Sequence, residues 1–226
     1  MNRLSEQAAL AKLQRLKISY QTSIRRGYEQ AAEDCRACQT PGACCLDAHF
    51  VNVHITRLEA VAIRETIERT PRLSYEEKRE VYLRAERAVS RYCLQASGDT
   101  FRQTFACPLY AARFGCLVHR RAKPAPCIQH ACYANWEDLP PDELQTRAEH
   151  RVEELNTEVY GAAWGWLPLP LWLKLLDPHG DGTELQSLIH DWSTRRVRHE
   201  SNSNHHARRK NILTRNKKVR SLPVIN

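Results

Sequence analysis

Apolar residues recur at three- and four-residue steps near the start of the chain. Leu13, Tyr20 and Ile24 follow this spacing, and no proline interrupts them. Such spacing places apolar side chains along one face of an α-helix. We therefore expect residues 1–33 to form an N-terminal helix, with its regular part over residues 3–33.

Two later helices carry capping signatures at their predicted starts. Thr56 is followed by Glu59, and Ser74 is followed by Glu77. In this capping box the Ser or Thr hydroxyl accepts a hydrogen bond from the backbone N–H of the glutamate, and the glutamate carboxylate accepts one from the backbone N–H of the Ser or Thr. Both bonds satisfy backbone donors that the start of a helix leaves unpaired. We expect helices from Thr56 to about residue 68 and from Ser74 to about residue 96.

The second half of the chain predicts three further helical segments. A helix is expected from the proline pair at 140–141 to about residue 160. Two shorter helical pieces are expected at residues 171–176 and 183–197, separated by a turn rich in aspartate and glycine. From residue 199 to residue 226 polar and basic residues dominate, and we expect a basic disordered tail.

The rest of the pattern is short or irregular. Apolar and polar residues alternate over 50–55, which predicts a short strand. Residues 99–135 combine cysteines and prolines with little periodicity, which indicates an irregular segment. The predicted fold class is mainly α, with helices packed around an irregular cysteine-rich metal-binding centre. This cysteine-cluster domain and its C-terminal helices are expected to occupy residues 34–198.

Apolar patterning also bears on the compartment. Charged residues interrupt every apolar stretch near the N-terminus, so the apolar segment of a signal peptide is not found there. The longest apolar run, residues 164–176, contains two prolines and a lysine and is too short to span a bilayer. We expect a cytoplasmic protein without a membrane span, and we interpret the run as a segment that packs on the helices.

The chain has nine cysteines, and in a reducing compartment clustered cysteines more often bind metal than form disulfides. A C-x2-C pair lets one turn direct both sulfurs at one ion, and a bound cation stabilises several thiolates in one place. Eight of the nine fall into two groups. The predicted metal ligands are Cys35, Cys38, Cys44 and Cys45 in the first group and Cys107, Cys116, Cys127 and Cys132 in the second.

The order of these motifs resembles a known family. The chain reads C-x2-C-x5-C-C from Cys35, then Val-His-Ile-Thr-Arg-Leu-Glu-Ala over residues 53–60, then Cys-Pro-Leu from Cys107, and later Pro-Cys ending at Cys127. This order is similar to that of the YkgJ-like CxxCxxxxCC family of zinc- or iron-chelating proteins, over roughly residues 35–132. The resemblance implies a metal-chelating domain, and it implies no particular reaction.

The spacing of the cysteines bears on the metal. Structural zinc sites usually combine two closely spaced pairs, whereas this chain has one C-x2-C pair followed by irregular gaps. Irregular cysteines in loops with neighbouring prolines are typical of iron–sulfur clusters. We therefore favour an iron–sulfur cluster over zinc as the cofactor and keep zinc as the alternative.

Three further residues near these motifs have simpler interpretations. Cys93 falls on an apolar stripe of the helix predicted to begin at Ser74, so we expect it to pack in the core. His119 and His130 flank predicted ligands, and we expect them to lie beside the metal or at the surface rather than to bind it.

The positive charge is concentrated near the C-terminus. Of the 34 Lys and Arg residues in a chain of net charge +8, ten lie between residues 195 and 220, where Glu200 is the one acidic residue. The rest of the chain is close to neutral. Such a tail can contact nucleic acid through its phosphates, although it lacks interleaved aromatic residues for base stacking.

These observations support three functional hypotheses. The first is a metal-binding protein that acts in electron transfer, metal handling or support of an unidentified partner protein. The second is an enzyme that uses the cluster as a redox or group-transfer cofactor. The third is a structural zinc module that presents a nucleic-acid-binding tail. The common nucleophile, phosphate-loop, dinucleotide and zinc-protease motifs do not occur, so we name no catalytic residue.

Overall fold

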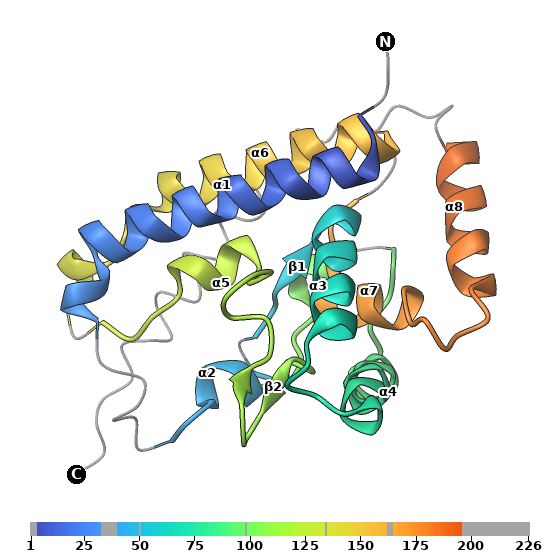
Figure 1. Ribbon diagram of the computed structural model, residues 1–226, viewed down its shortest axis with the longest axis horizontal. Helices are drawn as coiled ribbons and strands as arrows, with labels where there is room; N and C mark the ends of the chain where they lie inside the picture. The colour runs from blue at the N-terminus through green and yellow to red at the C-terminus, as the bar shows by residue number, and fades with distance from the viewer. Residues whose placement is uncertain are drawn as a thin grey trace.

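The structure is a computed structural model that describes residues 4–32, 40–49, 51–97, 99–133, 135–161 and 165–195. Within these ranges the protein is mainly α-helical, as the sequence predicts, and its strands form two-residue antiparallel pairs (Figure 1). No helix in this part of the chain combines the length and the apolar character needed to cross a membrane. The predicted basic tail, 199–226, lies outside the described residues.

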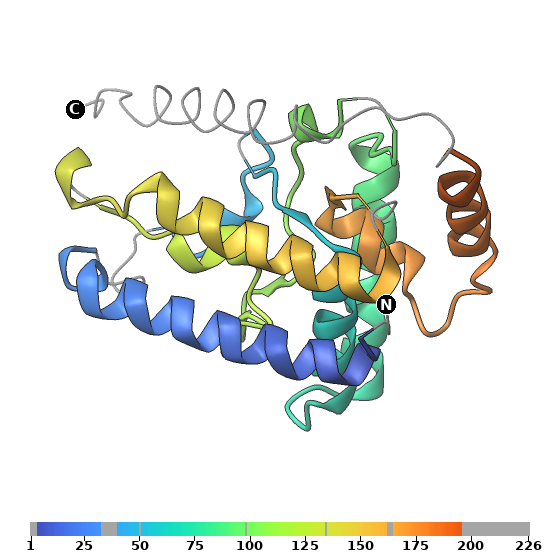
Figure 2. The same cartoon turned by 90° about the horizontal axis from the view of Figure 1, so that it is seen from above.

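Two long helices form one side of the molecule. Helices α1 (Glu6–Gly27) and α6 (Asp142–Tyr160) lie side by side in both views (Figures 1 and 2). The hydroxyl of Tyr160 donates a hydrogen bond to the carboxylate of Glu6, so the end of α6 meets the start of α1 and the helices run in opposite directions. Helix α1 is shorter than predicted because Tyr28, with φ of −139°, leaves the helical conformation.

The two predicted capping boxes are confirmed. Helix α3 (Arg57–Arg69) begins after Thr56, and helix α4 (Tyr75–Arg91) begins after Ser74. In both, the N-cap hydroxyl accepts from the N–H of the glutamate three residues on, and the glutamate carboxylate accepts from the N-cap N–H. The prediction for Cys93 is wrong: α4 ends before it, and Cys93 has φ of +50° and is exposed.

The main core forms where helices α3, α4 and α7 meet. Strand β1 (His54–Ile55) pairs with β4 (Leu167–Pro168), which leads directly into α7 (Leu169–Leu175). Trp172 is fully buried, and α7 packs mainly against α4. The interpretation of the apolar run as a packing segment is confirmed for its described part. The remaining short elements are α2 (Ala43–Leu46), β2 (Tyr110–Ala111), β3 (Gly115–Cys116), α5 (Ala125–Gln129) and α8 (Thr183–Arg195).

Candidate metal centre

The short helix α2 carries Cys44 and Cys45 and is held against the hairpin of β2 and β3. Gly42, just before α2, has φ of +84°, a conformation that favours glycine. A β-carbon added to Gly42 would lie 2.2 Å from the ring of Tyr110 in β2. Only glycine therefore lets the Tyr110 ring lie directly on the turn that begins α2.

Backbone hydrogen bonds continue this contact along the next residues. The N–H of Cys107 donates to the carbonyl of Cys45 at 2.7 Å, and the N–H of Phe105 donates to the carbonyl of Val51 at 2.8 Å. Cys45 and Cys107, about sixty residues apart in the sequence, therefore meet through their main chains. This pairing brings the vicinal cysteines of α2 next to Cys107.

The hairpin itself positions two of the predicted ligands. Tyr110 in β2 lies opposite Cys116 in β3, and the N–H of Leu117 donates to the carbonyl of Leu109 at 3.0 Å. Burial raises the pKa of Cys107 and of Cys116, and backbone N–H groups act against it: those of Leu109 and Tyr110 at Cys107, and that of Val118 at Cys116. A lower pKa favours the thiolate, which is the form of cysteine that binds metal.

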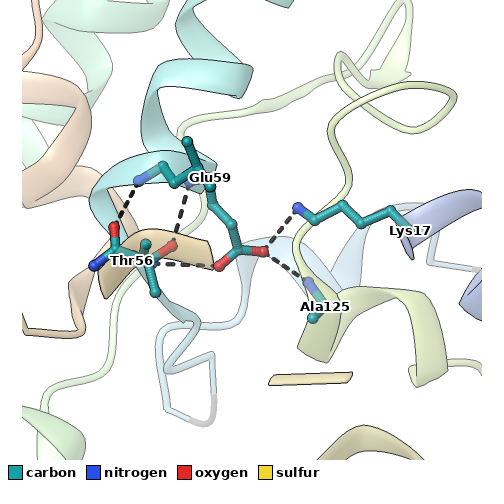
Figure 3. A network of polar contacts seen from close by, with 6 residues as sticks. Lys17, Thr56, Glu59 and Ala125 are labelled. Carbon is teal, nitrogen blue, oxygen red and sulfur yellow. Dashed lines mark hydrogen bonds and ion pairs between the residues drawn. The ribbon is translucent and has the colours of Figure 1, made fainter. Parts of the chain in front are cut away.

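A buried polar network holds α5, which carries Cys127, against α1 and α3 (Figure 3). The fully buried carboxylate of Glu59 accepts from the N–H of Ala125, at the start of α5, at 3.2 Å. The same oxygen lies 2.7 Å from Nζ of Lys17 on α1, whose side chain is 6% exposed. The other oxygen caps α3 through the N–H of Thr56. One carboxylate thus connects three helices.

Burial and mutual charge raise the pKa of the thiols in the hairpin and α5. Burial raises the pKa of Cys107 to about 12, and the nearby thiolate of Cys116 adds to this. Burial also raises the pKa of Cys127, and the negative charge of the Cys107 thiolate raises it as well. The ionisation of these three thiols is therefore linked through their charges. Lys123 acts in the opposite direction, because its charge lowers the pKa of both Cys116 and Cys127.

The vicinal cysteines of α2 belong to the same group. The thiol of Cys45 and the ring of His130 hydrogen-bond to the sulfur of Cys44, which lowers the pKa of Cys44. That hydrogen bond raises the pKa of Cys45, as do burial and the charges of Cys107, Cys44 and Cys127. Cys44 also raises the pKa of Cys116. We call Cys44, Cys45, Cys107, Cys116 and Cys127 the five-cysteine cluster.

The five-cysteine cluster leaves out three of the predicted ligands. Cys35 and Cys38 are outside the described residues. Cys132 is exposed, which distinguishes it from the partly buried five-cysteine cluster. Within the described residues, no group of three or more Cys, His, Asp or Glu side chains is arranged to hold one ion. The predicted eight-cysteine ligand set therefore stays a prediction.

Sequence reasoning missed the roles of Lys17 and Glu59. Glu59 was expected only to cap α3, although its second oxygen holds α5. The sequence carries a signal for Lys17, which lies four residues after Leu13 and three before Tyr20, on the apolar stripe of α1. A lysine within such a stripe is buried and needs a carboxylate partner.

No family model, curated protein or solved structure matches this chain. The resemblance to the YkgJ-like family therefore stays a prediction that rests on the motifs. The fold and the candidate site describe a mainly helical protein in which cysteines distant in the sequence are gathered beside a buried ion pair.

Proposed function

We propose that this chain is a metal-binding protein whose clustered cysteines hold an iron–sulfur cluster or zinc. The observation that carries the proposal is the five-cysteine cluster, in which thiols from α2, the hairpin and α5 influence one another's ionisation. Its proposed role is electron transfer, metal handling or support of a partner enzyme.

The chemistry of the donors fits a metal. Several thiols in a partly buried place resist ionisation, and a bound cation removes that resistance because coordinated thiols lose their protons. Burial raises the pKa of Cys107 and Cys116, and backbone N–H groups already act against that effect. Five partly buried thiols whose ionisation is linked have no packing advantage over small apolar residues, which supports a ligand rather than core packing as their role.

Cys35 and Cys38 complete the proposed ligand set. The residues on either side of their segment are anchored near other predicted ligands: Ala32 pairs with Tyr133, next to Cys132, and the carbonyl of Thr40 accepts from the N–H of Ala43 in α2. In the sequence Cys35 is three residues from Ala32 and Cys38 is two from Thr40.

Iron and zinc are favoured by different observations. The irregular spacing of the cysteines, with prolines beside Cys107 and Cys127, favours an iron–sulfur cluster. The contact between His130 and Cys44 favours zinc, because an imidazole nitrogen is a common zinc ligand beside thiolates. We place iron–sulfur first because of the irregular spacing of the cysteines.

Metal analysis of anaerobically purified protein tests the proposal. We expect iron with acid-labile sulfide and a coloured protein, or stoichiometric zinc in a colourless one. Cys107→Ser should lose most of the metal because it removes a clustered thiol. Cys93→Ser, at an exposed cysteine outside the cluster, should keep it. Wild-type protein with neither metal, or equal loss from both variants, would contradict the proposal.

A further inference from the structure

A cleft of about 960 Å³ borders the five-cysteine cluster at Cys116. One wall is the first half of α1, the second is the end of α3 and the turn after it, and the third is the segment from Phe114 to Ala122. Clefts of about 300–1,000 Å³ are the usual size of small-molecule sites. The cleft is therefore large enough for a small organic ligand beside the candidate metal centre.

The charges that line the cleft are strongly unequal. Among the described residues, Glu65 is the one acidic side chain that lines the cleft. Five basic side chains line it: Lys17, Arg69, Arg72, Arg120 and Arg121. Outside the basic tail the chain is close to neutral, so this excess belongs to the cleft.

Local ion pairs neutralise only part of this excess positive charge. Lys17 is neutralised by Glu59 at 2.7 Å, and Arg69 pairs with Glu65 at 3.1 Å. Arg72, Arg120 and Arg121 remain, all exposed at the rim. Three arginines around a concave surface attract anions, because guanidinium groups bind phosphate and carboxylate through paired hydrogen bonds.

The cleft also offers apolar surface. Leu10 lies on the first wall and Phe114 and Leu117 lie on the third, and the guanidinium carbon of Arg72 lies 5.6 Å from the centre of the Phe114 ring. Apolar walls below a cationic rim fit a ligand with an apolar body and an anionic group. We propose that this cleft binds a small organic anion, a phosphate or carboxylate on an aromatic or apolar body, next to Cys116. The proposal does not require a metal at the five-cysteine cluster.

Calorimetric titration of the full-length protein, as purified, tests the proposal with phenyl phosphate and benzoate as probes and phenol as the uncharged control. At least one anion should bind saturably and more tightly than phenol, and the tighter of the two identifies the anionic group. Arg120→Gln with Arg121→Gln should weaken that binding at least tenfold. Arg91→Gln with Arg147→Gln, which removes two exposed charges from α4 and α6, should change it less than twofold.

Two results would overturn the proposal: no saturable binding of either anion, or equal weakening in both double variants. Metal content, measured on the same samples, keeps this test separate from the metal proposal. Loss of two rim arginines should leave metal content unchanged, and protein without metal should still bind the anion.

Discussion

Glu59→Gln should lower the free energy of unfolding by about 3–5 kcal/mol, the usual cost of leaving one partner of a buried ion pair uncompensated. Lys17 is 6% exposed and lies 2.7 Å from the carboxylate that this change neutralises. The carboxylate also accepts from the N–H groups of Ala125 and Thr56, so the variant weakens contacts at the start of α5 and of α3. Urea unfolding followed by helical circular dichroism measures the loss.

The same helix provides a matched control. Glu65→Gln makes the same chemical change in α3, but its partner Arg69 has a side chain that is 71% exposed. Exposed pairs contribute about 0–1 kcal/mol, so this variant should lose little stability. The double variant Lys17→Met, Glu59→Gln removes both charges and should recover a large part of the loss. Equal costs for Glu59→Gln and Glu65→Gln would show that the buried pair does not hold the three helices together.

Gly42→Ala should release metal at least tenfold faster to a competing chelator. The added β-carbon would lie 2.2 Å from the Tyr110 ring, so the ring must move off the turn that precedes α2. This movement separates Cys44 and Cys45 from the hairpin that carries Cys107 and Cys116. The left-handed backbone, φ +84°, adds a further cost of about 1–2 kcal/mol for any residue with a β-carbon.

Two controls separate the steric effect from the backbone effect. Gly182→Ala introduces the same kind of strain at φ +71°, with no atom within 4 Å of the new β-carbon, so it should lower stability without changing metal release. In a Tyr110→Ala background the clash is absent, and Gly42→Ala should then add only backbone strain. If Gly42→Ala releases metal no faster than Gly182→Ala, α2 does not contribute to the metal site.

Local signals in the sequence predicted the helices well. The capping boxes at Thr56 and Ser74 act within four residues, and both are confirmed. Helix ends were harder to predict. Cys93 was placed in α4 because it continues the apolar spacing, but the chain turns at Tyr92 and Cys93 takes a positive φ. A positive φ at a residue other than glycine leaves no compositional signal, so the sequence could not predict it.

The candidate site was predictable only in part. Clustering of cysteines in the sequence predicted the ligand set, which stays a prediction; among the described residues Cys45 and Cys107 meet through a main-chain hydrogen bond. The supports around them come from distant segments: Gly42 depends on Tyr110, and Glu59 on Lys17. Strands β2 and β3 have two residues each, too few for an alternating pattern. Such long-range pairs leave no periodic pattern in a single sequence.

X-ray absorption at the edge of the bound metal tests the central proposal most directly, because it identifies the atoms that bind the metal. The proposal predicts a first shell dominated by sulfur at about 2.3 Å, the distance of metal–thiolate bonds. A first shell of nitrogen and oxygen alone, at about 2.0–2.2 Å, would contradict it, because the five-cysteine cluster would then not be the metal site.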